Sequence, residues 1–276
     1  MIEIDKQACI GCGECVEDCP AFNIALEDGS AQVQGPCFLC GHCVAICPQA
    51  AVVNPYYQEP VRDYDPATFN LSVENVVNAI KFRRSVRHFT NDPVTDEWLR
   101  IALIEAAGHA PTAVNRQQNR FFVVRNQLDE FKELIWDGIE EELAACSDTT
   151  GDFLTRLGVP RETLQRFHDQ RLGLGRFVGC AADYVFRNAP CVIAIDSADP
   201  LDGALAAAAI EAVAVASGYG VLYNGYLRRL IDNLDATDAF LDRDPGKELA
   251  ACLLVGRPAM RYRRTAPRRR PSIILR

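Results

Sequence analysis

The chain has 276 residues, of which 49% are hydrophobic and 24% charged, and its formal net charge is −8. This composition is typical of a folded globular protein and excludes intrinsic disorder. It also argues against a membrane span, because the most apolar stretch, residues 204–220, is interrupted by Glu211 and is shorter than the roughly 18 apolar residues that a bilayer requires.

The two ends of the chain carry opposite charge. Residues 1–60 hold eight acidic residues and one basic residue, a net −7, whereas residues 257–276 hold eight arginines and no acidic residue, a net +8. The acidic end disfavours nucleic-acid binding, because phosphate backbones attract cations; the arginine-rich end suits RNA, DNA or one small phosphate. The first five residues show no basic segment followed by an apolar core, so we expect no secretory signal, no membrane association and a cytoplasmic location.

Cysteine is unusually abundant near the N-terminus. Eight of the 12 cysteines fall between Cys9 and Cys47, and in a reducing compartment such clusters bind metal more often than they form disulfides. The segments Cys9–Pro20 and Cys37–Pro48 share the spacing C-x2-C-x2-C-x3-C-P. That spacing is the established signature of bacterial two-cluster ferredoxins, in which the fourth cysteine of each run binds the other cluster.

The signature predicts two 4Fe–4S clusters with exchanged ligands. The first is expected on Cys9, Cys12, Cys15 and Cys47, and the second on Cys37, Cys40, Cys43 and Cys19. A zinc site is the alternative, but zinc needs four ligands, whereas the chain offers eight in two matched sets. We expect the clusters to contribute folding energy to this small segment.

Local details of the cysteine runs lead to three further expectations. Gly11, Gly13 and Gly41 should let the backbone pass close to the sulfurs, where a Cβ would crowd it. The fourth cysteine of each run should begin a short helix. His42, between two ligands, should be a surface residue or a neighbour of the cluster rather than a ligand, since all iron positions are already filled.

Beyond the cysteines, proline-punctuated residues 54–66 predict a linker. We expect a two-cluster ferredoxin domain over 1–55, a linker over 56–70 and a larger domain over 71–276. Ser72 should cap a helix with one apolar face, and Thr95 should cap a second helix that ends at Gly108. Strands are predicted at 120–124, 191–195 and 251–255, and helices at about 128–145 and 200–217.

Few strands, not strictly alternating with helices, predict an α+β fold for the larger domain. No G-x-G-x-x-G sequence follows a strand, so a dinucleotide-binding Rossmann domain is not supported. Four segments of this domain carry chemical information: Arg83–Phe89, Ala110–Gln117, Gly218–Tyr226 and Pro267–Pro271. Each alone has an ordinary explanation, such as arginines that complement a helix dipole or form a solvated tail.

Taken together, these segments resemble the FMN-dependent nitroreductase family, over roughly residues 75–272. The resemblance implies a nitroreductase-like FMN-binding domain and a homodimer with FMN at the subunit interface. It implies that the FMN phosphate is held by Arg83, Arg84, Ser85 and Arg87, with Arg268 and Arg270 closing from the tail, where Arg269 could replace either. Guanidinium groups and a hydroxyl suit a phosphate dianion.

The resemblance also assigns residues to the flavin ring. Asn115 is expected at the N3/O4 edge, with Gln117 nearby, because an amide both donates and accepts. The turn containing Tyr223, Asn224 and Gly225 is expected near flavin N5, with the backbone amide of either Asn224 or Gly225 facing it. Residues 146–188 fall in the family's variable region and are candidates for a cover over the pocket.

Other titratable side chains of the larger domain have ordinary explanations. Cys180, Cys191 and Cys252 have apolar neighbours and are expected in the core. His109 and His168 could donate protons near a substrate, but an ordinary structural role is favoured for both.

The combined expectation is an FMN-dependent oxidoreductase of nitroreductase type. It would receive electrons from a low-potential donor, a protein or NAD(P)H, through two intramolecular 4Fe–4S clusters and reduce a small organic acceptor such as a nitro compound or a quinone. The alternative is a flavo-iron-sulfur subunit that passes electrons to a partner protein through its acidic N-terminal part. An iron–sulfur RNA-binding protein is a weaker alternative, because the total charge is negative.

Overall fold

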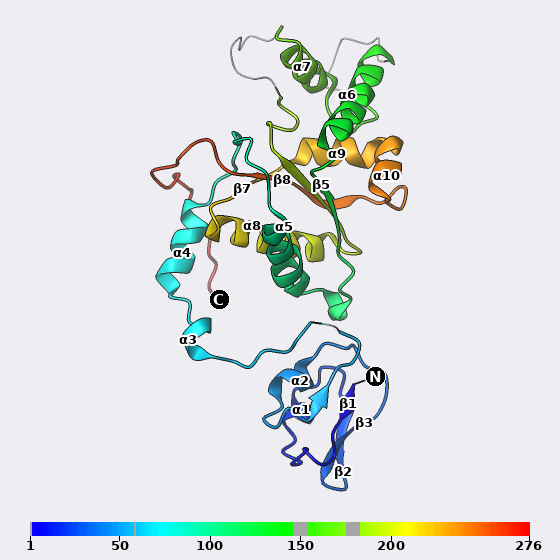
Figure 1. Cartoon of the computed structure of the whole chain (residues 1–276), viewed down its shortest axis with the longest axis vertical. Helices are drawn as coiled ribbons and strands as arrows, with labels where there is room; N and C mark the ends of the chain where they lie inside the picture. Colours follow the sequence, from blue (N-terminus) through cyan, green and yellow to red (C-terminus); the bar gives the residue numbers. More distant parts are fainter. Residues whose placement is uncertain (1, 58, 146–153, 175–182) are drawn as a thin grey trace. The chain divides into compact units, whose positions relative to one another are not determined.

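A computed structural model describes residues 2–57, 59–145, 154–174 and 183–276 (Figure 1). The chain divides into two compact units. Unit 1 comprises Met1–Leu71 and Thr112–Gln117, and unit 2 comprises Ser72–Pro111 and Gln118–Arg276.

Unit 1 is built from short elements around a small core. Strand β1 (Glu3–Ile4) pairs antiparallel with β4 (Val52–Val53), and β2 (Ile24–Glu27) pairs antiparallel with β3 (Ser30–Val33). The remaining elements are the helices α1 (Glu14–Glu17), α2 (His42–Ile46) and α3 (Pro66–Phe69) and the 3₁₀ turn η3 (Ala113–Asn115). The core contains two cysteines among its few apolar side chains: Ile2, Cys15, Ile24, Ala31, Cys43 and Val52.

The expectation that the fourth cysteine of each run begins a helix is wrong. Helices α1 and α2 begin directly after Gly13 and Gly41, which have left-handed φ values of 84° and 79°. Each helix therefore carries the third cysteine of its run, and α2 ends at Cys47, its C-cap. The physical reason is that the left-handed glycine ends the loop just before the third cysteine, so the residues that follow it turn helically well before the fourth cysteine.

Unit 2 contains a four-stranded antiparallel sheet with the order β5-β6-β8-β7. Its strands are β5 (Arg120–Val124), β6 (Cys191–Asp196), β7 (Gly220–Tyr223) and β8 (Leu249–Gly256). The three predicted strands are confirmed, and β7 was not predicted as a strand. Mixed helices and strands with antiparallel pairing confirm the α+β class.

Helices cover both faces of this sheet (Figure 1). Alternate residues of β6 point to opposite faces, so that Ile193 packs with α8 (Pro200–Ala216) and Val192 with α9 (Gly225–Asn233). The other helical elements of unit 2 are α4 (Val73–Phe82), α5 (Asp96–Arg100), the π-helical η1 (Ile101–Ala106), the 3₁₀ turn η2 (Ala107–His109), α6 (Leu128–Ala145), α7 (Arg161–Arg171) and α10 (Asp235–Leu241). None of the helices described is both long enough and apolar enough to cross a membrane.

The predicted caps are present. Ser72 Oγ accepts the Asn75 N–H at 3.1 Å, and Thr95 Oγ1 accepts the Trp98 N–H at 3.2 Å. The second helix does not end at Gly108, because the chain continues as π and 3₁₀ turns to His109. Gly108 lies inside the last turn and does not adopt the left-handed conformation that would stop a helix there.

Candidate functional site

Two cavities of unit 1 are lined by the eight clustered cysteines. One is lined by Cys9, Cys12, Cys15 and Cys47, and the other by Cys19, Cys37, Cys40 and Cys43. In each cavity, the structure thus brings together the first three cysteines of one run and the fourth cysteine of the other run. Among the described residues no group of three or more His, Cys, Asp or Glu side chains is arranged to hold a single metal ion. A 4Fe–4S cube has a different requirement, because each thiolate binds its own iron.

Backbone amides point at four of these sulfurs. Cys19 Sγ accepts the Asn23 N–H at 3.4 Å, and Cys47 Sγ accepts the Ala51 N–H at 3.2 Å, four residues further on in both runs. Cys9 Sγ accepts the Ala31 N–H and Cys37 Sγ accepts the Leu39 N–H. Hydrogen bonds of this kind stabilise thiolates and raise the reduction potential of an iron–sulfur cluster.

The repeated runs share their backbone conformation but not every residue. Gly11 has a φ of 68°, and a Cβ there would lie 2.5 Å from the carbonyl oxygen of Gly29. The matching position in the second run is Leu39, which adopts a left-handed φ of 55° without being glycine. The left-handed conformation is therefore required by the loop itself, whereas glycine is required sterically only in the first run.

Electrostatics in the two cavities favour protonated thiols until metal binds. Burial raises the pKa of Cys43 to about 11, helped by the charges of Cys37 and Cys40. Burial also raises the pKa of Cys15, with Cys12, Cys9 and Cys47 acting in the same direction. Cluster binding must therefore displace protons from these cysteines.

His42 is exposed, and its Nδ1 lies 3.2 Å from Asp18 Oδ2.

In unit 2, the arginine-rich segment lies beside strand β7. Ser85 forms a parallel bridge with Val221, and the Val86 N–H donates to the Val221 carbonyl at 3.0 Å. Gly220 makes this approach possible, because a Cβ there would lie 2.4 Å from a Val86 methyl carbon. The pairing places Arg83, Arg84, Ser85 and Arg87 next to the strand that leads to the predicted flavin turn.

Arg83 is paired with a carboxylate that the sequence analysis did not select as a site residue. Arg83 Nη1 lies 3.1 Å from Glu211 Oε1, and the Glu211 side chain is only 13% exposed on α8. The charges of both residues change the pKa of Tyr223, which lies at the end of β7. Burial raises the pKa of Tyr223 to about 12, the charge of Glu211 raises it further, and the charge of Arg83 lowers it.

The turn after β7 is organised by Asn224. Its backbone N–H donates to the Cys252 carbonyl at 2.8 Å, its Nδ2 donates to the Val185 carbonyl at 2.6 Å, and its Oδ1 accepts the Leu227 N–H at 3.0 Å. The backbone N–H of Asn224 and one N–H of its side-chain amide are thus committed to the fold. The Gly225 N–H has no acceptor among the described residues, and a side chain at Gly225 would meet no atom within 4 Å. Gly225 therefore begins α9 with an amide that no described residue accepts, and with room for a Cβ.

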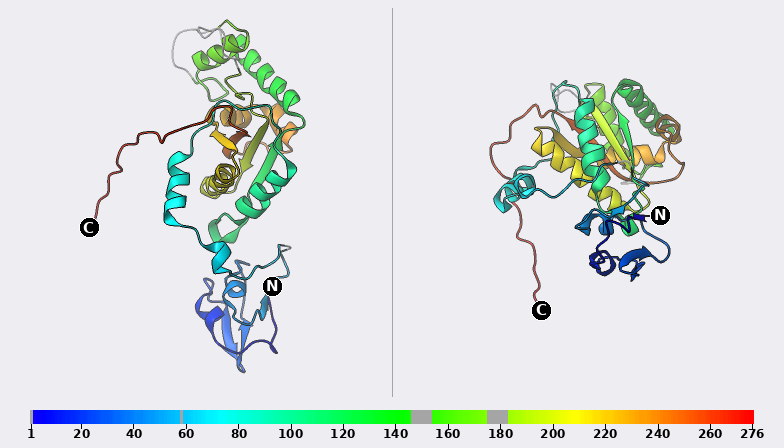
Figure 2. Two further views of the ribbon diagram at one scale, coloured as in Figure 1. Left: turned by 60° about the vertical axis from the view of Figure 1, so that its left-hand side comes forward. Right: turned by 60° about the horizontal axis from the view of Figure 1, so that its bottom comes forward.

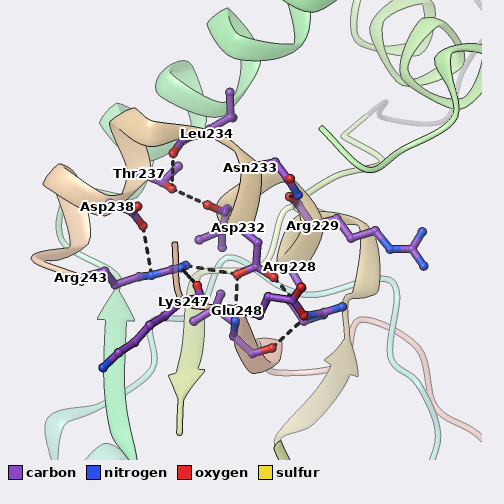
Figure 3. A network of polar contacts seen from close by, with 12 residues as sticks. Arg228, Arg229, Asp232, Asn233, Leu234, Thr237, Asp238, Arg243, Lys247 and Glu248 are labelled. Atoms are coloured by element: carbon purple, nitrogen blue, oxygen red, sulfur yellow. Dashed lines mark hydrogen bonds and ion pairs between the residues drawn. The ribbon is translucent and has the colours of Figure 1, made fainter. Parts of the chain in front are cut away.

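The far end of α9 is anchored by a network of charged side chains (Figure 3). Arg243, whose side chain is 1% exposed, forms ion pairs with Asp232 at 3.4 Å and Asp238 at 3.2 Å. Asp232 also pairs with Arg228 at 3.1 Å and accepts the Leu249 N–H at 2.8 Å. Despite these partners, burial raises the pKa of Asp232. The network joins α9, α10 and β8.

The other predicted flavin residues are placed differently. Asn115 and Gln117 belong to unit 1, where both side-chain amides donate to the Tyr57 hydroxyl, at 3.3 and 3.0 Å. Arg268 and Arg270 are exposed in the C-terminal tail, which Figure 2 shows in red leaving the sheet of unit 2. Neither arginine forms a hydrogen bond or ion pair with another residue that the structure describes.

One arginine close to these elements was missed. Arg187 is half-buried in the turn before β6, with a left-handed φ of 56° and its guanidinium 4.2 Å from the Tyr184 ring centre. The sequence signal was weak, since Arg187-Asn188 resembles an ordinary polar turn. The turn that carries Arg187 is held beside Asn224, because the carbonyl of Val185 accepts a hydrogen bond from the Asn224 side chain.

The remaining predictions concern cysteines and histidines. Cys191 and Cys252 are buried, as expected, and burial raises the pKa of both thiols. Cys180 and two parts of the candidate cover over 146–188, residues 146–153 and 175–182, lie outside the described residues. His168 lies on α7 with Nε2 3.8 Å from Glu140, and His109 ends η2.

Comparison with known proteins identifies both units. The family model described as "Nitroreductase family" matches residues 80–257, and a 4Fe-4S dicluster domain model matches residues 1–48. No curated protein matches the chain.

Several solved structures share the fold at low sequence identity. A nitroreductase with bound FMN from Bacteroides fragilis NCTC 9343 is 20% identical, with a TM-score of 0.52, over 72% of this chain and 98% of that chain. A nitroreductase with bound FMN from Desulfitobacterium hafniense DCB-2 is 21% identical, with a TM-score of 0.51, over 70% and 93%. A BluB-like flavoprotein from Clostridium difficile 630 is 19% identical, with a TM-score of 0.50, over 71% and 94%.

Proposed function

The chain belongs to the nitroreductase family, and we propose that it is an FMN-dependent oxidoreductase that reduces a small organic acceptor, a nitro compound or a quinone, with electrons received through its N-terminal 4Fe–4S clusters. One observation carries the proposal. The Gly225 amide, which no described residue accepts, follows β7 at the start of α9, and the same strand is flanked by the arginine-rich segment 83–87. A single chain therefore offers a donor for a flavin ring beside cations for its phosphate, together with two cavities each lined by four cysteines.

The residues near β7 fit FMN chemically. Arg83, Arg84, Ser85 and Arg87 would bind the phosphate, because guanidinium groups form paired charge-assisted hydrogen bonds with its oxygens. Arg268 and Arg270 would close over it from the tail, where both are free to move toward an anion. To bind the phosphate, Arg83 would have to give up its ion pair with Glu211 or contact both groups at once. Asn115 and Gln117 remain proposed contacts of the flavin edge.

Near flavin N5, we infer that the donor is the Gly225 amide rather than that of Asn224. The Asn224 N–H already binds the Cys252 carbonyl, whereas the Gly225 N–H has no acceptor in the part of the chain that the structure describes. A free amide at the first position of a helix is also favoured electrostatically, since the helix dipole is positive there. Tyr223 keeps its proton at neutral pH, because its pKa is raised to about 12.

The cysteine sets of unit 1 would each hold one cluster, with Cys47 completing the first and Cys19 the second. When bound, the clusters would supply single electrons and FMN would deliver them to the acceptor in pairs. The protein's own contribution is to bury one thiol of each set, to donate backbone N–H groups to the sulfurs and to hold Gly225 in place.

We propose that the working form is a homodimer. The apolar face of α4 is uncovered in the described chain, with Val73 79% and Ile80 66% exposed, and the tail residues Ile273, Ile274 and Leu275 are also exposed. Contiguous exposed apolar residues of this kind mark association surfaces. Because α4 leads directly into Arg83, a second copy on this face would also shield the proposed phosphate site.

The test compares two substitutions at Gly225 in anaerobically purified holoprotein. Gly225→Pro removes the N–H, and proline is well tolerated at the first helical position after the extended Asn224. Gly225→Ala keeps the N–H, and the added Cβ meets no atom within 4 Å. Loss of one such donor costs about 100-fold or more in turnover, so we expect Gly225→Pro to lose that much with a nitroaromatic and with a quinone, and Gly225→Ala far less. A lower flavin midpoint potential in the proline variant gives a second measurement.

The assay uses chemically reduced protein without any added partner. Wild-type protein with about eight irons and one FMN per chain that turned over neither acceptor would contradict the enzymatic proposal. It would favour the alternative, an electron carrier that docks a partner through its acidic N-terminal part.

A further inference from the structure

The two cysteine runs of unit 1 are covered by different segments at one matching position. In the first run, Gly11 lies against the turn of the β2–β3 hairpin, where an added Cβ would be 2.5 Å from the Gly29 carbonyl oxygen. In the second run, the Leu39 carbonyl accepts a hydrogen bond from Asn115 Nδ2 at 3.0 Å. Asn115 lies on η3, within the segment 112–117 that belongs to unit 1. The otherwise repeated runs are therefore asymmetric at this point.

Leu39 links the second cysteine set to Asn115. The Leu39 N–H donates to Cys37 Sγ at 3.3 Å, and the Leu39 carbonyl group is joined by its peptide bond to Cys40. Leu39 adopts a left-handed φ of 55°. In this conformation its N–H binds a ligand sulfur while its carbonyl binds Asn115. One residue and one hydrogen bond thus separate Asn115 from two ligands of the second predicted cluster.

The Asn115 side chain keeps an acceptor for a ligand. Its Nδ2 donates to the Leu39 carbonyl at 3.0 Å and to the Tyr57 hydroxyl at 3.3 Å, and Gln117 Nε2 donates to the same hydroxyl at 3.0 Å. No donor to Asn115 Oδ1 is present among the described residues. That oxygen can accept the N3–H of a flavin, which is the contact proposed for Asn115 above.

The segment 112–117 is held in one strained shape. Val114, Asn115 and Gln117 have left-handed φ values of 46°, 54° and 50°, although none is glycine. Thr112 fixes the loop, because its carbonyl accepts the Asn115 N–H at 3.0 Å and its Oγ1 accepts the Gln117 N–H at 3.0 Å. Backbone conformations of this kind cost free energy and are concentrated at functional sites.

The first cysteine set is the more accessible of the two. Cys12 is exposed, whereas the matching Cys40 is half-buried. Ile10 is 63% exposed and its counterpart Phe38 is 46% exposed. The first set is therefore easier to reach from solvent, as uptake of an electron from an outside donor requires.

We propose that the second cluster, on Cys19, Cys37, Cys40 and Cys43, is the one that passes electrons to FMN, and that Leu39, Asn115 and Tyr57 are its positioning residues. The proposal rests on the oxidoreductase function proposed above and assigns its electron route. In each transfer the second cluster is oxidised by one electron and FMN is reduced by one. The first cluster, reduced by the low-potential donor, then restores the second. Two transfers supply the two electrons that, with two protons from water, reduce a quinone to its hydroquinone.

The first test compares two matched pairs of substitutions by electron paramagnetic resonance of anaerobic holoprotein. Cys12→Ala with Cys47→Ala removes two ligands of the first cluster, and Cys40→Ala with Cys19→Ala removes the corresponding two of the second, so each protein should keep about four irons per chain. A reduced cluster accelerates the spin relaxation of a singly reduced flavin, and this effect falls steeply with distance. The protein without the first cluster should keep most of the acceleration, and the protein without the second should lose most of it.

The second test leaves both clusters intact. Tyr57→Phe removes the hydroxyl that holds Asn115 and Gln117, and Tyr56→Phe is the matched control, because Tyr56 is 62% exposed and no described residue bonds its hydroxyl. The proteins are mixed with reduced methyl viologen without any acceptor, and the flavin absorbance is followed. Loss of a hydrogen bond should slow flavin reduction about two- to tenfold in Tyr57→Phe. Tyr56→Phe should match wild type, and both variants should keep their iron and FMN.

The outcomes separate this proposal from the proposed function. Faster flavin relaxation that depends on the first cluster, or equally on both, would overturn the assigned route even if nitroaromatics and quinones are turned over. A Tyr57→Phe protein that reduces its flavin at the wild-type rate would also overturn it. Wild-type protein that shows the expected pattern but reduces neither acceptor would overturn the enzymatic function and support the route. Wild-type protein that binds no FMN would overturn both.

Discussion

The side chain of Asn224 joins two segments of unit 2 that are far apart in sequence, because its Nδ2 donates to the Val185 carbonyl at 2.6 Å while its Oδ1 caps α9 through the Leu227 N–H. Asn224 is buried, so neither bond can be replaced by water. The residue thereby sets both the start of the helix and the position of the turn that carries Arg187.

Substitution of Asn224 should separate these two roles. Asn224→Ala loses the cap, about 1 kcal/mol, and leaves the Val185 carbonyl unsatisfied, about 1–3 kcal/mol, so the free energy of unfolding should fall by about 2–4 kcal/mol. Asn224→Asp keeps the cap but loses the donor. Chemical denaturation should rank the three proteins wild type, Asp, Ala; an alanine variant as stable as wild type would show that these bonds are unimportant.

Cluster ligation can be tested by paired cysteine substitutions. Cys40→Ala combined with Cys19→Ala removes two ligands of one predicted cluster, so about four irons per chain should remain. Cys40→Ala combined with Cys47→Ala removes one ligand from each cluster and should leave almost none. Iron analysis and electron paramagnetic resonance of the reduced proteins distinguish the two outcomes. The reverse pattern would mean that each run binds its own cluster.

Gly11 and Leu39 occupy matching places in the two cysteine runs and should respond differently. Gly11→Ala combines left-handed backbone strain of about 1–2 kcal/mol with the close approach to the Gly29 carbonyl, so it should destabilise unit 1 by at least that amount. Leu39→Gly relieves strain but makes the unfolded chain more flexible, and it should stay within about 1 kcal/mol of wild type. The midpoint of denaturant-induced loss of cluster absorbance measures both. Equal effects would refute the steric argument.

Arg243 should be essential to unit 2. Arg243→Met leaves the partly buried Asp232 and Asp238 without their shared partner, the buried Arg243, and removal of one member of a buried ion network costs about 3–5 kcal/mol. Arg229 is the control, since it lies on the same helix, is exposed, and in Figure 3 directs its guanidinium away from the network. Arg229→Met should change the free energy of unfolding by less than about 0.5 kcal/mol.

The pKa of Tyr223 should depend on the charge of Glu211. Burial raises the pKa of Tyr223 to about 12 and Glu211 contributes, so Glu211→Gln should lower it toward the ordinary value. The measurement is the phenolate absorbance near 295 nm during an alkaline titration, with Tyr223→Phe as the reference. No change in the Glu211→Gln protein would show that burial alone sets the pKa.

The same shift makes stability depend on pH. The folded protein holds the Tyr223 proton more tightly than the unfolded chain, so this contribution is fully present below about pH 10 and is lost as the pH rises through about 12. Tyr223→Phe should lack this loss.

The sequence by itself determined what depends on neighbours in the chain. The cysteine spacing predicted the two ligand sets that line separate cavities, and the hydroxyls of Ser72 and Thr95 predicted helix starts, because capping bonds span three residues. Short continuous apolar runs predicted β5, β6 and β8. Strand β7 escaped prediction because its glycine-bounded residues looked like a turn.

Only the tertiary structure decided what depends on packing between distant segments. It paired Arg83 with Glu211, 128 positions away, and it bound the Asn224 amide to the Cys252 carbonyl while no described residue accepts the Gly225 amide. The reason is that free and satisfied polar groups look identical in a sequence. Which donor remains available for a ligand is known only when every competing acceptor has been placed.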